Sequence, residues 1–227
     1  MASATRLFDV LIPPRCVSCG GGEALLCPAC AGSLRLLSPP LCRRCGAPTA
    51  WQVERCTECS GRRLAFRSAR AAVAYDGVAR PLVRAWKERG LRRLGPILAG
   101  LVAAEVARPE ADVLVFVPGD RDRTCWRGLN AAEALARWLA RAWELPAEPL
   151  LHRTRRDRRQ RRLSREGRRA NVRGLFAAAG AVPRRVVLVD DVYTTGATAS
   201  AAATALRRAG ARSVDVVTLA RALRLGA

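Results

Sequence analysis

Several features are scarce in this chain of 227 residues, and each scarcity excludes something. No stretch of about 18 residues is apolar and free of charge, so the sequence predicts no membrane-spanning helix. The first residues, MASATRLFDVLIPPRC, contain a short apolar stretch that Asp9 and two prolines interrupt, which is too short for the apolar region of a signal peptide. We therefore expect a cytoplasmic protein without membrane insertion.

Acidic residues are also scarce relative to basic ones. The chain has 40 lysines and arginines against 19 acids, which gives a formal net charge of +21. Such a surface attracts nucleic acids and phosphorylated ligands. However, Lys87 is the only lysine, and an excess carried by arginine is also what codon bias in a GC-rich genome produces. Charge alone is therefore weak evidence for nucleic-acid binding. His152 is the only histidine, and we interpret it as a surface residue.

Cysteine, in contrast, is concentrated in one part of the chain. Eight of the nine cysteines lie before residue 60 and form four C-x-x-C pairs: Cys16/Cys19, Cys27/Cys30, Cys42/Cys45 and Cys56/Cys59. A C-x-x-C turn places two thiolates on one side of a tight loop, and two such turns supply the four ligands of a tetrahedral ion. The pattern predicts two Zn²⁺ sites. Gly20 and Gly46 each follow a second cysteine, where a positive φ turns backbone N–H groups toward sulfur.

Alternatives to this interpretation differ in strength. Spacing leaves both sequential and interleaved pairing of the C-x-x-C turns open. Iron–sulfur clusters use the same ligands, although paired ribbons favour zinc. A disulfide framework is not expected in a reducing compartment, and no βαβ pattern surrounds the pairs as in redox proteins. Because four cysteines leave no open coordination position, we expect the ions to stabilise the fold and not to catalyse. We interpret the ninth cysteine, Cys125, as a packing residue.

Beyond about residue 63, apolar strand patterns alternate with helical ones. Strands are predicted at 69–77, 112–119, 185–191 and 213–221, and helices at 82–90, 95–107, 129–143 and 197–210. Half of the residues are apolar, so the chain has enough material for one sizeable core with a small unit attached. Strands that alternate with helices predict an α/β fold with a mostly parallel sheet covered on both faces.

The segment 186–199, VVLVDDVYTTGATA, carries the clearest sign of a ligand site. Ligands of parallel sheets bind beyond the carboxyl ends of the strands, where Asp190 and Asp191 are expected. N–H groups at a helix N-terminus bind anions, threonine hydroxyls add donors, and Gly196 lets the backbone approach a phosphate closely. Two carboxylates suit vicinal hydroxyls or a divalent cation. The segment therefore predicts a site for a phosphorylated sugar.

This segment closely resembles the phosphoribosyl pyrophosphate (PRPP) signature of type I phosphoribosyltransferases. With the cysteine pairs and the segments LFDVLIPPRCVSCG, AWKERG, RGLNAAE and NVRGLF, the chain resembles the ComF family of competence-associated proteins over nearly its full length. The resemblance implies a double zinc ribbon over 1–62, followed by a domain with the type I phosphoribosyltransferase fold over 63–227.

The resemblance also implies roles for individual residues. Asp190 and Asp191 would meet the ribose hydroxyls with Mg²⁺ nearby, Lys87 would meet a phosphate, and the turn after 112–118 would be the pyrophosphate loop. The 5-phosphate would be held by Thr194, Thr195, Gly196, Ala197 and Thr198. Residues 153–173, which contain eleven arginines, match the flexible loop that closes over PRPP in this fold.

The pyrophosphate side departs from the family pattern. Phe116, Gly119 and Asp120 stand where relatives typically carry proline, leucine and histidine, and Ala131 stands in place of glutamine. Asp120 puts negative charge where pyrophosphate is expected, unless it serves the metal. Thr194 stands where purine-salvage relatives carry a carboxylate, which argues against that class of acceptor. Binding of the ligand is thus predicted more firmly than turnover.

Two functions follow. The first is an enzyme that transfers the phosphoribosyl group of PRPP to a nitrogen nucleophile and releases pyrophosphate. The second is a non-enzymatic protein that binds PRPP or a nucleotide and engages single-stranded DNA or a helicase partner during DNA uptake. The tryptophans are not interleaved with the basic segment, as a base-stacking surface would need, and Trp138 and Trp143 have the pattern of helix-packing residues.

Overall fold

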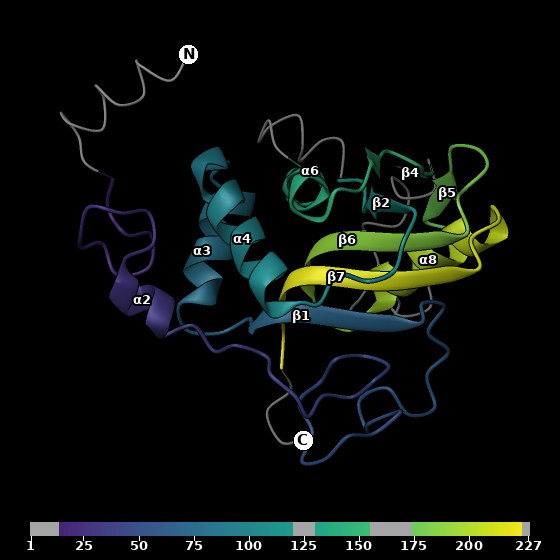
Figure 1. Ribbon diagram of the computed structural model, residues 1–227, viewed down its shortest axis with the longest axis horizontal. Coiled ribbons are helices and arrows are strands. Elements are labelled where there is room, and N and C mark those ends of the chain that lie inside the picture. The colour runs from purple at the N-terminus through teal and green to yellow at the C-terminus, as the bar shows by residue number, and fades with distance from the viewer. Residues whose placement is uncertain (1–13, 120–129, 155–173, 224–227) are drawn as a thin grey trace, which may run out of the picture.

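A five-stranded parallel sheet forms the centre of the part of the protein described by the computed structural model, which comprises residues 14–119, 130–154 and 174–223 (Figure 1). The strand order is β1-β7-β6-β2-β3. These strands are β1 (Ser68–Ala74), β2 (Val113–Phe116), β3 (Ala147–Glu148), β6 (Arg185–Tyr193) and β7 (Ser213–Arg221). The residues of β2 are all buried, which explains its continuous apolar sequence VLVF. Eight of the nine residues in β7 are also buried, and they include the polar residues Asp215, Thr218 and Arg221.

Helices cover both faces of this sheet. They are α3 (Ala79–Lys87), the 3₁₀ turn η1 (Arg92–Leu94), α4 (Gly95–Glu105), α6 (Ala131–Trp143) and α8 (Ala197–Arg208). The connections β1 to β2 and β2 to β3 run one way across the sheet, whereas β6 to β7 runs the other way. Right-handed crossovers therefore place α8 on the face opposite to α4 and α6, which pack against each other (Figure 1).

The reversal of direction lies between β6 and β2. In open parallel sheets, the loops that follow two such strands run to opposite faces of the sheet. The crevice between these loops, outside the carboxyl ends of the strands, is where ligands bind. Val113↔Val186 and Phe116↔Val189 pair the two strands, so β6 continues past the end of β2. This places the residues after Phe116 and those from Asp190 onward at the same edge of the sheet.

Large aromatic residues fill the interfaces of the helices with the sheet. Trp86 of α3 is fully buried and Trp143 of α6 is 5% exposed. Gly95 begins α4 next to Trp138, and a Cβ at this glycine would lie 2.8 Å from the indole nitrogen. The prediction that Trp138 and Trp143 pack between helices is consistent with these contacts, and no base-stacking role is left for Trp86.

The expected fold class is confirmed: a mostly parallel sheet with flanking helices follows two groups of four cysteines. All four predicted strands and all four predicted helices occur, and their ends differ by a few residues. Within the described residues, the elements that the sequence patterns missed are short: α2 (Pro28–Gly32), η1, β3, and the antiparallel pair β4 (Leu151–Arg153) and β5 (Phe176–Ala178). A domain boundary between residues 62 and 63 stays a prediction. Cys42 and Cys59, which precede this boundary, belong to the same apolar core as the sheet.

No helix within the described residues has both the length and the apolarity needed to cross a bilayer.

Candidate functional site

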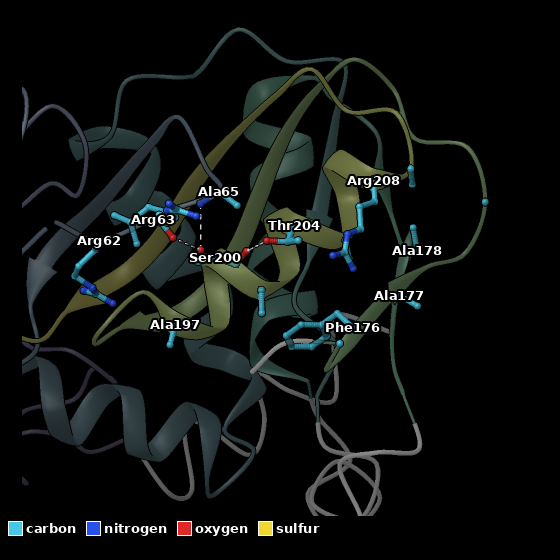
Figure 2. Close-up of a pocket in the computed structure, with 16 residues that line it drawn as sticks. Arg62, Arg63, Ala65, Phe176, Ala177, Ala178, Ala197, Ser200, Thr204 and Arg208 are labelled. Carbon is cyan, nitrogen blue, oxygen red and sulfur yellow. Dashed lines mark hydrogen bonds between the residues drawn. The ribbon is translucent and has the colours of Figure 1, made fainter. Parts of the chain in front are cut away.

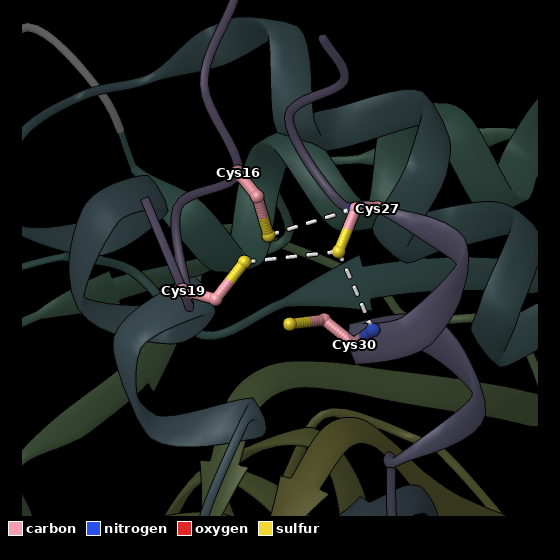
Figure 3. A group of neighbouring side chains, drawn as sticks. All are labelled: Cys16, Cys19, Cys27 and Cys30. Atoms are coloured by element: carbon pink, nitrogen blue, oxygen red, sulfur yellow. Dashed lines mark hydrogen bonds between the residues drawn. The ribbon is translucent and has the colours of Figure 1, made fainter. Parts of the chain in front are cut away.

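The cysteines assemble into two groups of four in the order of the chain. The Sγ atoms within each group all lie within 4.8 Å of one another. The first group is Cys16, Cys19, Cys27 and Cys30, and the second is Cys42, Cys45, Cys56 and Cys59. Figure 3 shows the four sulfurs of the first group pointing toward a common centre. The structure thus selects sequential pairing and excludes the interleaved alternative.

The spacing of the sulfurs suits a tetrahedral zinc ion. A Zn–S bond of about 2.3 Å requires sulfurs about 3.8 Å apart. The observed separations are 3.8 Å for Cys19–Cys27, 3.6 Å for Cys42–Cys59 and 3.5 Å for Cys45–Cys56. A disulfide would need about 2.05 Å, and all eight cysteines are free. Both groups therefore fit structural zinc with four thiolate ligands and no open position.

Backbone N–H groups stabilise the thiolate form of one cysteine in each group. Burial opposes ionisation of Cys42, but N–H groups of Cys45, Cys56 and Arg44 outweigh it and lower the pKa of Cys42 to about 7. For Cys16, burial again acts against the charge, and backbone donors bring its pKa down to about 6. Gly20 and Gly46 adopt φ of 75° and 70°, as expected for the glycine after each second cysteine.

The two groups differ in how they meet the sheet. Cys19 is exposed, and Cys27 and Cys30 are only partly buried. In contrast, Cys42 and Cys59 are fully buried in the main core. The N–H of Ala69 in β1 donates to the Arg44 carbonyl (3.0 Å), so the turn that carries Cys42 and Cys45 is hydrogen-bonded directly to the edge of the sheet. The second group is thereby part of the α/β core.

Asp190 and Asp191 lie inside β6 and not at its end, because the strand continues to Tyr193. Asp190 pairs with Thr218 of β7 in the sheet register. Its side chain accepts a hydrogen bond from the Asp191 N–H (2.9 Å), and the Asp191 carboxylate accepts one from the Val192 N–H (2.7 Å). The two carboxylates are thus held by the backbone of their own strand.

Burial and neighbouring charges set the protonation of Asp190. Burial raises its pKa from 3.8 to about 7, and the negative charge of Asp191 adds to the rise. The Asp191 N–H and the positive charges of Lys87 and Arg153 act in the opposite direction without cancelling it. One carboxyl of the pair thus titrates near neutral pH.

Lys87 and Arg153 bring positive charge to the carboxylates from two other elements. Lys87, at the end of α3, forms an ion pair with Asp191, whose side chain is 8% exposed. Arg153 in β4 donates from Nε to the Pro118 carbonyl (3.0 Å) and lies 5.1 Å from the centre of the Phe176 ring. Lys87 was singled out in the sequence, whereas Arg153 was hidden among eleven arginines of one segment.

The loop after β6 has the form of an anion cradle. Thr194 and Thr195 are exposed, and Gly196 precedes α8 with a φ of 72°. Thr195 Oγ1 accepts from the Ala197 N–H (3.3 Å). Within the described residues, the N–H groups of Thr194, Thr195 and Gly196 donate no hydrogen bond. These donors lie between the carboxyl end of β6 and the start of α8, as in sites that bind anions.

Only the beginning of the expected pyrophosphate loop is described. The Val117 carbonyl accepts from the Asn130 side chain (3.3 Å), which also caps α6. Together with the bond from Arg153 to Pro118, this contact holds the chain where it leaves β2. Asp120, Cys125 and Trp126 lie outside the described residues, as does 155–173, nearly all of the predicted flexible loop. Ala131 is buried at the start of α6, so it presents no polar group to a ligand.

A pocket of about 1050 Å³ lies on the outer side of α8, apart from the two carboxylates (Figure 2). Small apolar side chains, the alanines of α8 and β5, form the floor of this pocket. Its basic side chains are Arg62 and Arg63 on one side and Arg208 on the other, as Figure 2 shows. The Ser200 and Thr204 hydroxyls that line it are already bonded, to the Ala65 N–H and to the Ser200 carbonyl respectively.

Known proteins align with nearly the whole length of this chain. Residues 7–60 match the double zinc ribbon domain. DNA utilization protein YhgH of Salmonella typhi is 31% identical over 228 residues, which span 93% of this chain and 99% of that protein. Competence protein F of Haemophilus influenzae is 29% identical, with 92% and 97% covered. Competence protein ComFC of Streptococcus pneumoniae is 26% identical, with 88% and 89% covered.

Among solved structures, one similar protein is the glutamine PRPP amidotransferase of B. subtilis, crystallised with ADP and GMP. It is 30% identical with a TM-score of 0.38 over 56% of this chain, which spans a quarter (25%) of that protein. The similarity to the YhgH protein extends over both chains almost completely, and the double ribbon matches in its expected place. The chain therefore belongs to the ComF family of competence-associated proteins.

Proposed function

We propose that the protein binds PRPP at the carboxyl edge of β6 and β2. One observation supports this most directly. Asp190 and Asp191 of β6 are followed at once by a loop whose N–H groups make no hydrogen bond with the described residues, and then by the start of α8. The carboxylates meet the two ribose hydroxyls, and the loop 194–198 binds the 5-phosphate. Lys87 exchanges part of its contact with Asp191 for a phosphate oxygen.

Charge neutralisation is the main task on the other side of the ligand. Pyrophosphate carries several negative charges, and Arg153 lies where the chain leaves β2, beside the expected pyrophosphate loop. Mg²⁺ prefers oxygen ligands and binds phosphates with the help of few protein groups. The phosphate oxygens of PRPP and the two carboxylates therefore supply the oxygen atoms that coordinate it. Asp190 must lose its proton to serve in this set, because its pKa lies near 7.

The reaction that this site serves is phosphoribosyl transfer to a nitrogen nucleophile. The nitrogen forms a bond with C1 of the ribose, the bond from C1 to the pyrophosphate oxygen breaks, and pyrophosphate leaves with the electron pair. The nitrogen then releases its proton to solvent. The protein contributes orientation and electrostatic stabilisation of the departing charge. This activity belongs in a reducing compartment such as the cytoplasm, where the eight cysteines keep their thiolate form.

Calorimetric titration with PRPP and Mg²⁺ tests the binding. The expected result is one site per chain in the wild-type protein and a loss of affinity of at least about tenfold in Asp191→Asn, because the backbone contacts remain while the charge is lost. Asp112→Asn is the matched control. Asp112 pairs with Arg185 at the amino end of β2, on the opposite edge of the sheet, so its loss leaves PRPP affinity unchanged. No binding by the wild-type protein contradicts the proposal.

Pyrophosphate release separates the enzyme from a binding protein. Purified protein is mixed with PRPP, Mg²⁺ and a panel of nitrogen nucleophiles, and pyrophosphate is measured enzymatically. Release that depends on the nucleophile and disappears in Asp191→Asn supports transfer. Tight binding without release for every nucleophile leaves the protein as a PRPP sensor and overturns the enzymatic part of the proposal.

A second function, binding of single-stranded DNA, is favoured by the pocket along α8. Arg62, Arg63 and Arg208 line an apolar floor, an arrangement that suits a phosphate backbone. Relatives carry names that refer to competence and DNA utilization. Such binding, with or without a helicase partner, fits a role in DNA uptake.

Fluorescence anisotropy with a labelled oligonucleotide tests this second function. Replacement of the three pocket arginines by glutamine is expected to weaken binding and to reduce its dependence on salt concentration. The matched control replaces three exposed arginines outside the pocket, Arg43, Arg137 and Arg141. Equal weakening in both triple variants shows that only net charge matters and contradicts a role of the pocket.

A further inference from the structure

A buried arginine connects the second cysteine group with the ligand loop. Arg221, the last residue of β7, is 1% exposed. Its Nη1 donates to the Cys45 carbonyl (2.6 Å), and its Nη2 lies 3.7 Å from Cys45 Sγ. The same nitrogen donates to the Glu58 carboxylate (2.7 Å). Glu58 stands between the ligands Cys56 and Cys59, so the guanidinium is tied to the metal-binding turns at three atoms.

The other side of this guanidinium faces Tyr193. Arg221 and Tyr193 are partners in the register of β6 and β7, which places their side chains on one face of the sheet. The guanidinium carbon lies 4.7 Å from the centre of the tyrosine ring. Phe66 meets the same ring edge-on, with the centroids 6.2 Å apart. The position of the ring is thus determined by contacts from both sides.

Tyr193 in turn supports the ligand loop from below. A Cβ on Gly196 would overlap the Tyr193 hydroxyl and would lie 2.6 Å from Cζ, so the backbone of the loop rests directly on the ring. The Tyr193 hydroxyl is buried and makes no hydrogen bond with the described residues. Burial raises its pKa to about 12, so it stays neutral beneath the loop. Movement of this ring therefore moves Gly196.

We propose that Arg221 is a positioning residue through which the second cysteine group, when it holds its metal, fixes Tyr193 and the phosphate-binding loop. Four thiolates on a divalent ion carry a net negative charge, and the Glu58 carboxylate adds to it, so the buried guanidinium offsets part of this charge. Loss of the metal frees the turns that hold Arg221, and the ring and the loop lose their common support. The metal is therefore not only a local staple of the ribbon.

The first cysteine group lacks this connection. Cys19 is exposed, and within the described residues no hydrogen bond or ion pair joins its four cysteines to β6, β7 or the loop 194–198. The two groups thus provide an internal comparison. Loss of the first ion leaves the loop unchanged, whereas loss of the second loosens it.

Hydrogen exchange of the loop tests this role without any ligand. Cys56→Ser and Cys19→Ser each remove one metal equivalent, which elemental analysis confirms. The hydrogen-bonded amides that hold the loop belong to Ala197, Ser200 and Ala222. In Cys56→Ser these amides are expected to exchange at least about tenfold faster than in the wild-type protein, and in Cys19→Ser at the wild-type rate. Equal exchange in Cys56→Ser and the wild-type protein, with the second metal lost, overturns the proposal.

A second pair of variants separates Arg221 from the metal itself. Arg221→Met is expected to keep two metal ions and still to show faster exchange of the Ala197, Ser200 and Ala222 amides. Arg43→Met, which removes an exposed ion pair with Glu54 in the same ribbon, is expected to change nothing there. If Arg221→Met does not fold, Tyr193→Leu provides the same test, because it removes the ring and leaves the arginine. Wild-type exchange in a folded, metal-replete Arg221→Met or Tyr193→Leu contradicts the inference.

The effect on ligand affinity rests on the proposed function and is measured separately. In Arg221→Met, affinity for ribose 5-phosphate is expected to fall about tenfold, while affinity for inorganic pyrophosphate stays unchanged, because only the 5-phosphate contacts the loop. A general loss of stability lowers both. If the wild-type protein binds neither compound, the proposed function fails, and the exchange measurements still decide the role of Arg221.

Discussion

Lys87 and Asp191 form an ion pair that joins the end of α3 to the last part of β6. The lysine side chain is 43% exposed and the carboxylate only 8%, so the pair has one side open to a ligand. Asp191, the buried partner, is one of the two adjacent carboxylates, whereas Lys87, the exposed partner, can turn toward a phosphate. This contact unites two residues that the sequence analysis had selected on separate grounds.

Replacement of Lys87 by methionine is expected to weaken PRPP binding about tenfold and to destabilise the fold by about 1–2 kcal/mol, because Asp191 is left as a buried carboxylate without its cation. The pKa of Asp190 is expected to rise further, since Lys87 lowers it. Calorimetry and thermal unfolding measure both effects. Arg84→Met, one turn earlier in the same helix and exposed, is the control. Equal effects in the two variants contradict a specific role of Lys87.

Asp190 makes stability depend on pH in a direction opposite to that of most carboxylates. Its pKa is raised from 3.8 to about 7, so between these values the folded chain holds a proton that the unfolded chain releases. Stability contributed by this group therefore falls as pH rises through this window, and the loss is complete above pH 7. Asp190→Asn is expected to be more stable than the wild-type protein at pH 8, by about 1–2 kcal/mol.

Thermal unfolding of Asp190→Asn at several pH values checks this prediction. The gain is expected to shrink as the pH falls toward 3.8 and to vanish below this value, where the residue is protonated in both the folded and the unfolded state. Asp112→Asn is the control with the opposite sign. Hydrogen bonds and charge from Arg185 lower the pKa of Asp112, so its replacement removes a stabilising carboxylate and gives no gain at pH 8. A pH-independent gain in Asp190→Asn speaks against a titrating carboxyl.

The two cysteine groups are expected to differ in their effect on global stability. Cys59→Ser and Cys19→Ser each remove one ligand and one metal equivalent. Cys59 is fully buried in the core that includes the sheet, whereas Cys19 is exposed. Cys59→Ser is therefore expected to cost at least about 2 kcal/mol more, measured by denaturant unfolding with metal content determined in parallel. Similar losses in both variants would show that the groups stabilise the fold equally.

Gly196→Ala is expected to destabilise the protein by about 1–3 kcal/mol and to abolish binding of the 5-phosphate. The residue has a φ of 72°, and its Cβ would overlap Tyr193. Gly100→Ala in α4 is the matched control, because a Cβ there meets nothing within 4 Å. This control is expected to gain up to about 1 kcal/mol from helix propensity. Chemical denaturation measures both, and an unperturbed Gly196→Ala contradicts the close contact with Tyr193.

The sequence by itself determined those features that depend on local spacing. The C-x-x-C pairs indicated two metal groups, because two ligands in one tight turn need no distant partner. The alternating apolar patterns predicted the long strands and helices of the described residues, and the segment 186–199 was correctly expected to contain a strand, a loop and the start of a helix. Short elements such as β4 and β5 were missed, because three residues carry no readable period.

Only the tertiary structure decided which distant groups act together. The structure selected sequential pairing of the cysteines. The contact of Lys87 with Asp191 and the place of Arg221 between Cys45 and Tyr193 depend on strand order and register. A single sequence does not encode these relations in any local pattern, because the partners meet only after the sheet has formed. In particular, nothing in the composition distinguishes Arg221 from the exposed arginines of the chain. Its burial beside a metal-binding turn is what gives it a role.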